Sequence, residues 1–349
     1  MNEAAILTSP NSPLTLHILP IPKPSAYELL IKVSFIGINA IEAKIAKRGT
    51  PPPPSYPFIP GSSYTGTIAA IGSSDTEYQV GDRVLVSKRF GTQENAYGAY
   101  QRYALVTAEE KMVVRLPQRI NKDEEAALVA LIMNASCVAG LFSGRLGLRR
   151  PDSQEKEEES EKKKILIYGG SSSFGRLAVQ YLRCAGYDVI TTSSPQCMDT
   201  VRTLSGSRSH VVDHTLPPDQ IIADIRARGP YDVVVDMIST PQTISLASHI
   251  LVAQGGGKLF ATQPAFGPED FPDGVERVFE PWSDSLYEEG NEGLMEWVVG
   301  TYLPFGMEKG WISAQEVEMV QGLKGIDGVL ERMVEGYGGG KRFVVELGS

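Results

Sequence analysis

Residues 165–195 read ILIYGGSSSFGRLAVQYLRCAGYDVITTSSP, and this stretch decides the fold. Residues 165–168 are apolar without polar alternation, which predicts a strand buried on both faces. A pair of glycines ends the strand, and the next segment carries apolar side chains on one face of a predicted helix. Gly186 ends this helix, and residues 189–192 predict a second strand. Strand, turn, helix and strand within about 30 residues form a βαβ unit, the first half of a dinucleotide-binding fold.

The turn between the first strand and the helix has the pattern G-x-x-S-x-x-G, formed by Gly169, Ser172 and Gly175. A pyrophosphate requires small residues at such a turn, because it must approach the backbone N–H groups at the start of the helix. The pattern therefore predicts a nucleotide site. A glycine-rich turn that binds nothing is the alternative interpretation.

The end of the second strand indicates which nicotinamide cofactor binds. In the NAD pattern, a carboxylate about 20 residues after the glycines bonds the ribose 2′-hydroxyl. Here the strand runs into Ser193, Ser194 and Pro195 without an acidic residue, and Arg202 and His214 follow. Hydroxyl and cationic groups suit a 2′-phosphate. We therefore expect NADPH rather than NADH.

Composition excludes several classes of protein. The 349 residues are enough for two domains with cores of their own. The formal net charge of −9 argues against nucleic acid and anionic membrane surfaces as partners. The 3 cysteines lack the paired spacing of a disulfide framework or a zinc cluster. We see no signal peptide and no apolar run of about 18 residues, and so expect a cytoplasmic enzyme, monomeric or dimeric.

Short runs bounded by Pro, Gly and Ser predict a small β-barrel over the first part of the chain. These runs are residues 4–7, 14–18, 28–33, 64–71, 83–86 and 99–106. A helix is predicted to begin after Asn121, which serves as its cap. Residues 151–164 are dense in charge and lack apolar side chains, which predicts a solvated insert.

After the βαβ unit, strands and helices alternate, which implies a parallel, doubly wound sheet. The predicted strands are residues 210–214, 231–236 and 257–261, and the predicted helices are residues 218–228 and 243–252. Residues 263–290 are rich in Pro, Gly, Asp and Glu and are expected to be irregular. The last predictions are helices at residues 294–303, 314–319 and 328–334 and a strand at residues 343–347.

The order of these motifs resembles that of the medium-chain dehydrogenase/reductase superfamily over nearly the full length. The matching motifs are GIN at 37–39, IPGSSYTG at 59–66, YQVGDRVLV at 78–86, GAYQRYALV at 98–106 and GGGKRFVVEL at 338–347. The resemblance implies an α/β fold with two domains. A GroES-like β-barrel catalytic domain is expected at residues 1–128 and 263–349, and a Rossmann domain with a doubly wound parallel sheet at residues 129–262.

Within the superfamily, the chain looks most like the fungal trans-acting enoyl reductases that serve polyketide synthases. YGGSSSF, TTSSP and VVDH match that group. The resemblance implies an unsaturated acyl substrate and a polyketide synthase as partner. Gly169 and Arg202 are already expected to contact NADPH, and the resemblance implies further contact residues. These are Ile41, Glu42, Lys44, Ser171, Ser172, Ser173, Phe174, Ser194, Pro195, Gln196, Cys197, His214, Ile238, Ser239, Gly340 and Lys341.

The chain departs from this group at some positions. The motif Asn-Pro-x-Asp-x-Lys is NAIEAK here, from Asn39 to Lys44. His214 replaces a tyrosine in the 2′-phosphate region. The Leu-Pro and Thr-Ala elements over the nicotinamide are altered to Leu128-Val129 and to residues 134–136, which read NAS.

The residues at the zinc positions of related alcohol dehydrogenases argue against a catalytic metal. Those enzymes place a cysteine after Gly-x and a His-Glu pair after Pro-Gly, whereas this chain has Asn39, Ser62 and Ser63. Neutral amides and hydroxyls are poor zinc ligands. Without a Lewis acid, alcohol oxidation is disfavoured, and conjugate reduction of an enoyl or enone remains feasible.

Such a reduction places negative charge on the carbonyl oxygen, which a donor must stabilise. Lys44 is the first candidate, and Asn134 and Ser136 are secondary candidates. A salt bridge or a cofactor-phosphate contact is the alternative role for Lys44. Two alternative functions stay open: a quinone or alkenal oxidoreductase, and a non-redox protein that keeps the NADP(H) pocket.

The segment after the predicted strand at 257–261 indicates the substrate class. Strand ends face the ligand crevice in open α/β sheets. The segment is apolar and aromatic, which suits a long acyl chain; its residues are Pro264, Phe266, Phe271, Phe279, Trp282 and Tyr287. Packing of these aromatics on the catalytic domain is the alternative interpretation.

Overall fold

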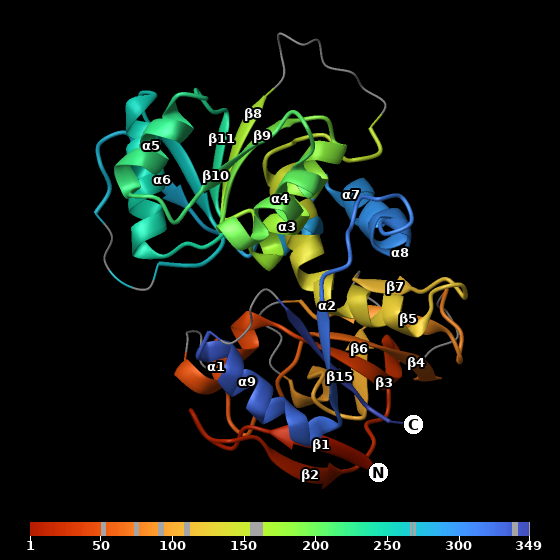
Figure 1. Cartoon of the computed structure of the whole chain (residues 1–349). Helices are drawn as coiled ribbons and strands as arrows, with labels where there is room; N and C mark the ends of the chain where they lie inside the picture. Colours follow the sequence, from red (N-terminus) through yellow and green to blue (C-terminus); the bar gives the residue numbers. More distant parts are fainter. Residues whose placement is uncertain are drawn as a thin grey trace. The chain divides into compact units, whose positions relative to one another are not determined.

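The computed structural model describes residues 1–49, 54–72, 77–89, 94–107, 112–153, 163–265, 267, 270–336 and 341–348 (Figure 1). The chain forms two compact units. Unit 1 comprises Met1–Met133, Tyr287–Met307 and Ala314–Ser349, and unit 2 comprises Asn134–Leu286 and Glu308–Ser313.

Unit 2 contains a 6-stranded parallel sheet with the order β10-β9-β8-β11-β12-β13. In chain order this is 3-2-1-4-5-6, the order of Rossmann folds, and the doubly wound prediction is confirmed. The strands are β8 (Lys164–Tyr168), β9 (Asp188–Ser193), β10 (His210–Asp213), β11 (Val233–Asp236), β12 (Gly257–Ala261) and β13 (Val275–Val278). The helices are α3 (Ser173–Cys184), α4 (Met198–Ser205), α5 (Pro218–Arg226) and α6 (Pro241–Ala253).

The prediction that residues 263–290 are irregular is wrong in one respect. β13 pairs in parallel with β12, with Gly257 opposite Val275 and Phe260 opposite Val278. Charged residues interrupt this short edge strand, so its sequence lacks the apolar run of β8. Because β13 extends the parallel sheet, residues 263–286 lie in unit 2, whereas the predicted boundaries assigned them to the catalytic domain.

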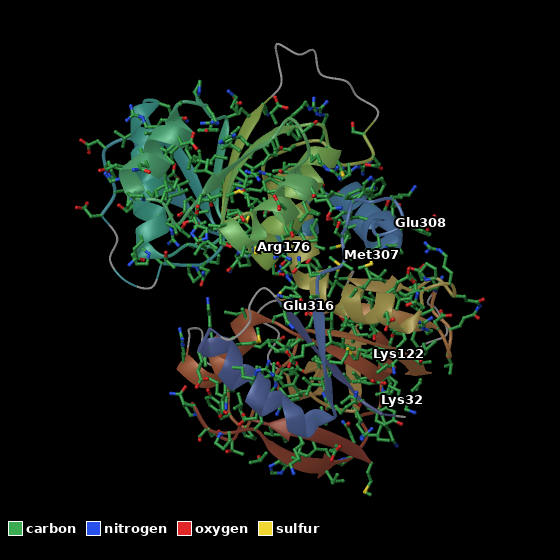
Figure 2. The ribbon with its side chains drawn as sticks, viewed as in Figure 1. Lys32, Lys122, Arg176, Met307, Glu308 and Glu316 are labelled. Atoms are coloured by element: carbon green, nitrogen blue, oxygen red, sulfur yellow. The ribbon has the colours of Figure 1, made fainter. Side chains whose placement is uncertain are left out.

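A long helix, α2 (Lys122–Ala139), continues into the π-helix Gly140–Arg145 and passes from unit 1 into unit 2. Its first residue, Lys122, is labelled in Figure 2. The side-chain oxygen of Asn121 accepts the backbone N–H of Glu124 at 3.0 Å, and Glu124 accepts the N–H of Asn121 at 3.0 Å, which confirms the predicted cap.

The expectation that no apolar segment reaches about 18 residues is wrong. Lys122–Arg145 contains such a window, with a mean hydropathy of 1.9, and by length and composition could cross a membrane. However, 78% of that window is buried inside the protein. This part of the helix is largely apolar because most of it packs inside the protein, as in the core of a large globular fold.

Unit 1 contains a 7-stranded sheet with the order β14-β15-β3-β4-β5-β7, to which β6 adds by pairing with β3, and the 2-stranded sheet β1-β2. The strands are β1 (Asn2–Ile6), β2 (Thr15–Leu19), β3 (Glu28–Ile38), β4 (Ser63–Ile71), β5 (Arg83–Ser87), β6 (Tyr103–Thr107), β7 (Val113–Arg115), β14 (Val317–Gln321) and β15 (Arg342–Glu346). The helices are α1 (Ala40–Arg48), α7 (Glu292–Trp297), α8 (Leu303–Phe305) and α9 (Ile326–Val334). A π-helix, Val298–Tyr302, joins α7 to α8.

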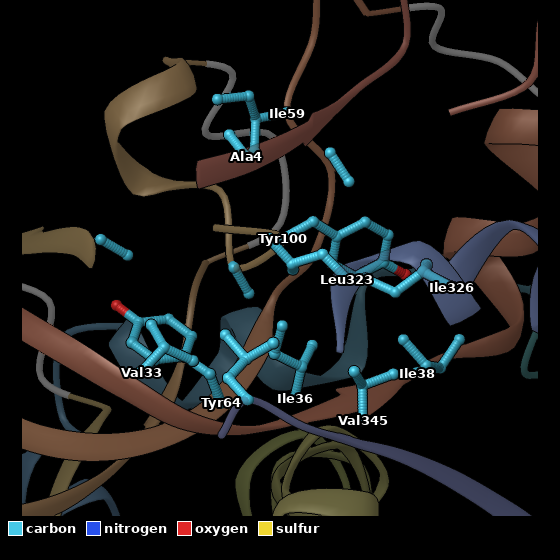
Figure 3. Close-up of a cluster of buried hydrophobic side chains, with 14 of the residues drawn as sticks. Ala4, Val33, Ile36, Ile38, Ile59, Tyr64, Tyr100, Leu323, Ile326 and Val345 are labelled. Atoms are coloured by element: carbon cyan, nitrogen blue, oxygen red, sulfur yellow. The ribbon is translucent and has the colours of Figure 1, made fainter. Parts of the chain in front are cut away.

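The core of unit 1 joins both ends of the chain. β15 runs antiparallel to β3, with Val345 opposite Ile36, so a strand near the C-terminus joins the sheet of the N-terminal strands. Figure 3 shows these side chains together with Tyr64, Tyr100 and Ile326, all of them buried.

The prediction of a helix at residues 314–319 is wrong. These residues lead into the strand β14, which pairs in parallel with β15, with Val317 opposite Arg342. A segment of about five residues with mixed apolar and polar side chains fits both the helical and the strand period of hydrophobicity. Pairing with β15 is what makes this segment a strand. α1 was not predicted, whereas the helix at 328–334 and the strand at 343–347 are confirmed as α9 and β15.

We predict opposite effects for two glycine substitutions at the third position of a helix. A Cβ on Gly175 of α3 would lie 2.1 Å from the carbonyl oxygen of Gly169, whereas a Cβ on Gly328 of α9 would meet nothing within 4 Å. Gly175→Ala should therefore lower the free energy of unfolding by about 1–3 kcal/mol. Gly328→Ala should raise it by up to about 1 kcal/mol through helix propensity. Thermal unfolding checks both, and stabilisation by Gly175→Ala would contradict the close packing of the turn.

Candidate functional site

The turn between β8 and α3 leaves no room for side chains at its glycine positions. A Cβ on Gly170 would lie 2.2 Å from the hydroxyl oxygen of Thr191 on β9. Gly169 has a φ of 92°, which side-chain-bearing residues rarely adopt. The predicted glycines are thus needed sterically, and Gly170 joins them as a position that the sequence pattern did not single out.

Hydrogen bonds fix the turn at the start of α3. The hydroxyl oxygen of Ser172 accepts the N–H of Gly175 at 3.0 Å, and that of Thr192 accepts the N–H of Gly169 at 2.8 Å. Helix starts present N–H groups that suit a phosphate. A turn that has glycine where the backbone packs most closely, and that leads into a helix start, fits the pyrophosphate of a dinucleotide.

Arg176 links the same turn to the loop after β9 through hydrogen bonds. Its Nε donates to the carbonyl oxygen of Ser171 at 3.1 Å, and a terminal nitrogen donates to Cys197 Sγ at 3.6 Å. The structure thus brings together the predicted segments Ser171–Phe174 and Ser194–Cys197. Arg176 was not among the predicted site residues, since a helix arginine gives no signal of such contacts.

The end of β9 carries hydroxyl groups and lies beside His214. The N–H of His214 donates to the carbonyl oxygen of Ser193 at 3.1 Å, because β10 pairs with β9. His214 is exposed, and so is Arg202 on α4, which faces Asp199 at 3.3 Å. The nearby carboxylate of Asp213 accepts hydrogen bonds from Thr215, which lower the pKa of Asp213.

A buried carboxylate, Asp236 at the end of β11, organises the next turn. Its Oδ1 accepts the N–H groups of Ile238 at 2.8 Å and Ser239 at 3.0 Å, and its Oδ2 accepts the hydroxyl of Thr243 at 2.5 Å. Ser239 is buried and has a φ of 56°, a conformation that is strained for a residue other than glycine. Burial raises the pKa of Asp236, while these hydrogen bonds oppose the rise.

The predicted residues Ile238 and Ser239 are therefore held by a carboxylate that the sequence analysis missed. The hydroxyl of Ser239 donates to the carbonyl oxygen of Asp236 at 2.9 Å and accepts the N–H of Thr262 at 2.8 Å. Thr262 follows β12, so these bonds join the carboxyl ends of two neighbouring strands. Ligands of open α/β sheets bind at this edge.

Asn134 and Ser136 lie on α2, within unit 2. The side-chain amide of Asn134 donates to the hydroxyl oxygen of Ser173 at 3.3 Å, which places it at the start of α3. Ser136 is buried, with 2% of its surface exposed. One of the two secondary catalytic candidates thus contacts the nucleotide turn directly.

The aromatic residues after β12 have different positions. Trp282 is buried, donates to the carbonyl oxygen of Ala261 at 2.8 Å and lies edge-on to Phe260 and Phe279. It is therefore a core residue of unit 2. Phe271 is half-buried, and Phe266 falls outside the described residues.

In unit 1, the residues at the expected zinc positions form a closed hydrogen-bond network. The amide nitrogen of Asn39 lies 3.0 Å from the hydroxyl oxygen of Ser63 and 3.4 Å from that of Ser62. The hydroxyl and N–H of Ser62 donate to Glu42 Oε1 at 2.6 and 2.8 Å. Within the described ranges, no three His, Cys, Asp or Glu residues cluster as a metal site would require.

Two buried groups complete this network. Tyr100 donates its hydroxyl to Glu42 Oε2 at 2.9 Å, and burial beside that carboxylate raises the pKa of Tyr100 well above its usual value. Arg342 donates to Asn39 Oδ1 at 3.2 Å and through Nε to the carbonyl oxygen of Ala130 at 2.9 Å. Burial lowers the pKa of Arg342 to about 10, so its guanidinium stays charged at neutral pH.

The remaining predicted residues lie around α1 and the chain end. The Glu42 side chain is bonded within this network, and its backbone N–H donates to the carbonyl oxygen of Asn39 at 3.1 Å. Lys44 is half-buried, and burial together with the nearby Arg48 lowers the pKa of Lys44. Lys341 is exposed and pairs with Glu316 at 2.7 Å, and Gly340 falls outside the described residues.

Comparison with known proteins identifies the family. The model of the alcohol dehydrogenase GroES-like domain matches residues 25–118. Dehydrogenase azaJ from Aspergillus niger is 30% identical over 356 residues, which cover 99% of this chain and 99% of that protein. The chain belongs to the medium-chain dehydrogenase/reductase superfamily. The resemblance seen in the motifs is thereby confirmed.

Two further proteins are similar to this chain. The trans-enoyl reductase tndF from Aspergillus flavipes is 27% identical over 353 residues, 97% of each chain. Quinone oxidoreductase from Escherichia coli, solved in complex with NADPH, has a TM-score of 0.78 at 18% identity over 99% of each chain. The latter likeness shows a shared fold.

We predict that Asp236 is required for cofactor affinity. Asp236→Ala removes the acceptor that holds Ser239 at positive φ, and should weaken NADPH binding about tenfold or more. Asp232, just before the opposite end of β11, accepts the N–H of Lys164 at 2.7 Å and provides the matched control. Fluorescence titration measures the NADPH affinity of the two variants. Equal affinities for Asp236→Ala and Asp232→Ala would contradict this role.

Proposed function

We propose that the protein is an NADPH-dependent, zinc-independent reductase of an activated C=C bond, and that it serves a polyketide synthase in trans as an enoyl reductase in the cytoplasm. The observation that carries the proposal is the network of Asn39, Ser62 and Ser63. Amide and hydroxyl groups bonded to one another and to Glu42 offer neither thiolate nor imidazole to a zinc ion. The similarity to trans-enoyl reductase tndF over 97% of each chain supports the same reading.

The residues of unit 2 fit NADPH. The glycine turn would hold the pyrophosphate, and Ser194, Arg202 and His214 would offer hydroxyl and cationic groups to the 2′-phosphate. When bound, the nicotinamide supplies a hydride to the β-carbon of the unsaturated substrate. The strained turn at Ser239 holds backbone groups at the cofactor edge of the sheet.

In this proposal, Lys44 supports the reaction by stabilising the negative charge that develops on the carbonyl oxygen of the substrate. Its ammonium group is half-buried and has a lowered pKa, which makes it a better proton or hydrogen-bond donor than an exposed lysine. In the proposed reaction, Lys44 donates a hydrogen bond to the carbonyl oxygen as the enolate develops, and a proton from water then adds to the α-carbon to complete the reduction. Asn134 and Ser136 are the further donors, and contact with a cofactor phosphate remains the alternative role of Lys44.

The alternative functions differ in the acceptor that they reduce. The fold shared with a quinone oxidoreductase keeps a quinone or alkenal reductase as the second candidate. A non-redox role that keeps the NADP(H) pocket is the third. All three candidate functions are compatible with this fold, so only the measured turnover of different acceptors can distinguish them.

Turnover with a set of acceptors tests the proposal. We expect the purified protein to oxidise NADPH with an α,β-unsaturated thioester that carries an extended acyl chain, and much more slowly with a simple quinone or aldehyde. NADPH consumption is followed at about 340 nm across enoyl thioesters, enones, quinones and aldehydes. A quinone preference would move the assignment to the second candidate. Tight NADPH binding without oxidation by any acceptor would favour the third.

Cofactor choice gives a second prediction. NADPH should bind more tightly than NADH, and Arg202→Ala and His214→Ala should each weaken NADPH binding about tenfold while leaving NADH affinity unchanged. Arg208, an exposed arginine that faces Asp188 at 3.6 Å, is the control. Equal affinities of the unaltered protein for the two cofactors would refute the assignment of the 2′-phosphate site.

Lys44 gives a third prediction. Lys44→Ala should lower kcat about 10²–10³-fold if the ammonium stabilises the enolate. Lys47→Ala, on the same helix, removes the ion pair with Asp327 at 2.7 Å and should leave kcat nearly unchanged. A small fall in kcat with a raised KM for NADPH would instead identify Lys44 as a cofactor-binding residue.

A further inference from the structure

A groove of about 470 Å³ follows α6 from the carboxyl end of β11, between the helix and residues 267 and 270–272, entirely within unit 2. Its wall includes Ser239, just after β11, and His249 on α6. From Pro241 to His249, α6 rises about 12 Å, at roughly 1.5 Å per residue. This volume is in the range of small-molecule sites, and the groove is long enough for an extended chain.

The floor of the groove is apolar. Ile244 is 4% exposed and belongs to the core of unit 2, and the half-buried Phe271 packs against the same core. Pro241 and Pro272 also line the groove. These side chains have no hydrogen-bonding groups, so they favour a hydrocarbon.

Most polar side chains of the wall already have partners within the protein. The hydroxyl of Ser248 donates to the carbonyl oxygen of Ile244 at 2.8 Å, and His249 Nδ1 lies 2.8 Å from the carbonyl oxygen of Ser245. The hydroxyl of Ser239 is bonded to Asp236 and Thr262. Asp270, which also lines the groove, is exposed and can remain in water. A polar ligand would therefore lose hydration with little compensation.

We propose that this groove holds the hydrocarbon chain of the acyl substrate, with the chain leading from the cofactor edge at Ser239 along α6. This inference rests on the proposed function and names a chain-binding subsite for it. The groove is continuous with Ser239, which belongs to the predicted cofactor site. Each methylene buried in it should raise kcat/KM about two- to fourfold until the groove is full.

The test compares chain lengths in two tryptophan variants of α6. Ser245 is exposed and lines the groove, so Ser245→Trp fills it without changing the core. Val252 is 45% exposed on the same helix and does not line the groove, so Val252→Trp is the matched control. The measured quantity is the ratio of kcat/KM for S-decenoyl pantetheine to that for S-crotonyl pantetheine. We expect Ser245→Trp to lower this ratio at least tenfold and Val252→Trp to leave it unchanged.

Binding of saturated S-decanoyl and S-butyryl pantetheine, measured by calorimetry, separates this inference from the proposed function. A decanoyl preference that Ser245→Trp abolishes supports the groove even where no enoyl thioester is reduced, an outcome that would overturn only the proposed function. Reduction of enoyl thioesters of all chain lengths at equal kcat/KM would contradict the role of the groove in binding the chain, and would leave the proposed function standing. Equal ratios for the two tryptophan variants would also overturn the groove.

Discussion

The structure of unit 2 depends on a steric constraint, namely that no Cβ fits between β8, β9 and the start of α3. Gly170 faces Thr191 on the neighbouring strand, and Gly175 faces the carbonyl of Gly169. Helix and sheet can meet this closely because side chains are absent at their junction. The same absence opens the backbone to a ligand, so the packing requirement and the binding requirement select the same residues.

Buried carboxylates organise the polar parts of both units. Asp236 accepts N–H groups from the two positions after Met237, and Glu42 accepts N–H groups from Asn39 and Ser62. In each case a charged side chain replaces a missing backbone partner and fixes a turn near a predicted site. Charge-assisted hydrogen bonds of this kind are stronger than neutral ones, so both turns are held firmly without a bound ligand.

The sequence predicted most of the parallel sheet because its strands are apolar on both faces and the glycine turn has a specific pattern. It missed β13 and mistook β14 for a helix, because short edge strands with charged residues follow no clear period. It identified Ser239 through a family resemblance but not Asp236, since a carboxylate at a strand end looks like any surface acid. The contacts of Arg342 could not be foreseen, because they join residues more than 200 positions apart in the chain.

Arg342 has a consequence for attempts to turn this chain into a metalloenzyme. Replacing Asn39 and Ser62 by cysteine and histidine would supply ligands, yet the guanidinium that now bonds Asn39 would remain beside the new site. A fixed positive charge in a buried region repels a divalent cation more strongly than it would in water. Arg342 also donates to the carbonyl oxygen of Ala130, so its removal would break a hydrogen bond between β15 and α2 as well. A zinc site at this position would therefore require changes at both ends of the chain, because Asn39 and Arg342 lie 303 positions apart.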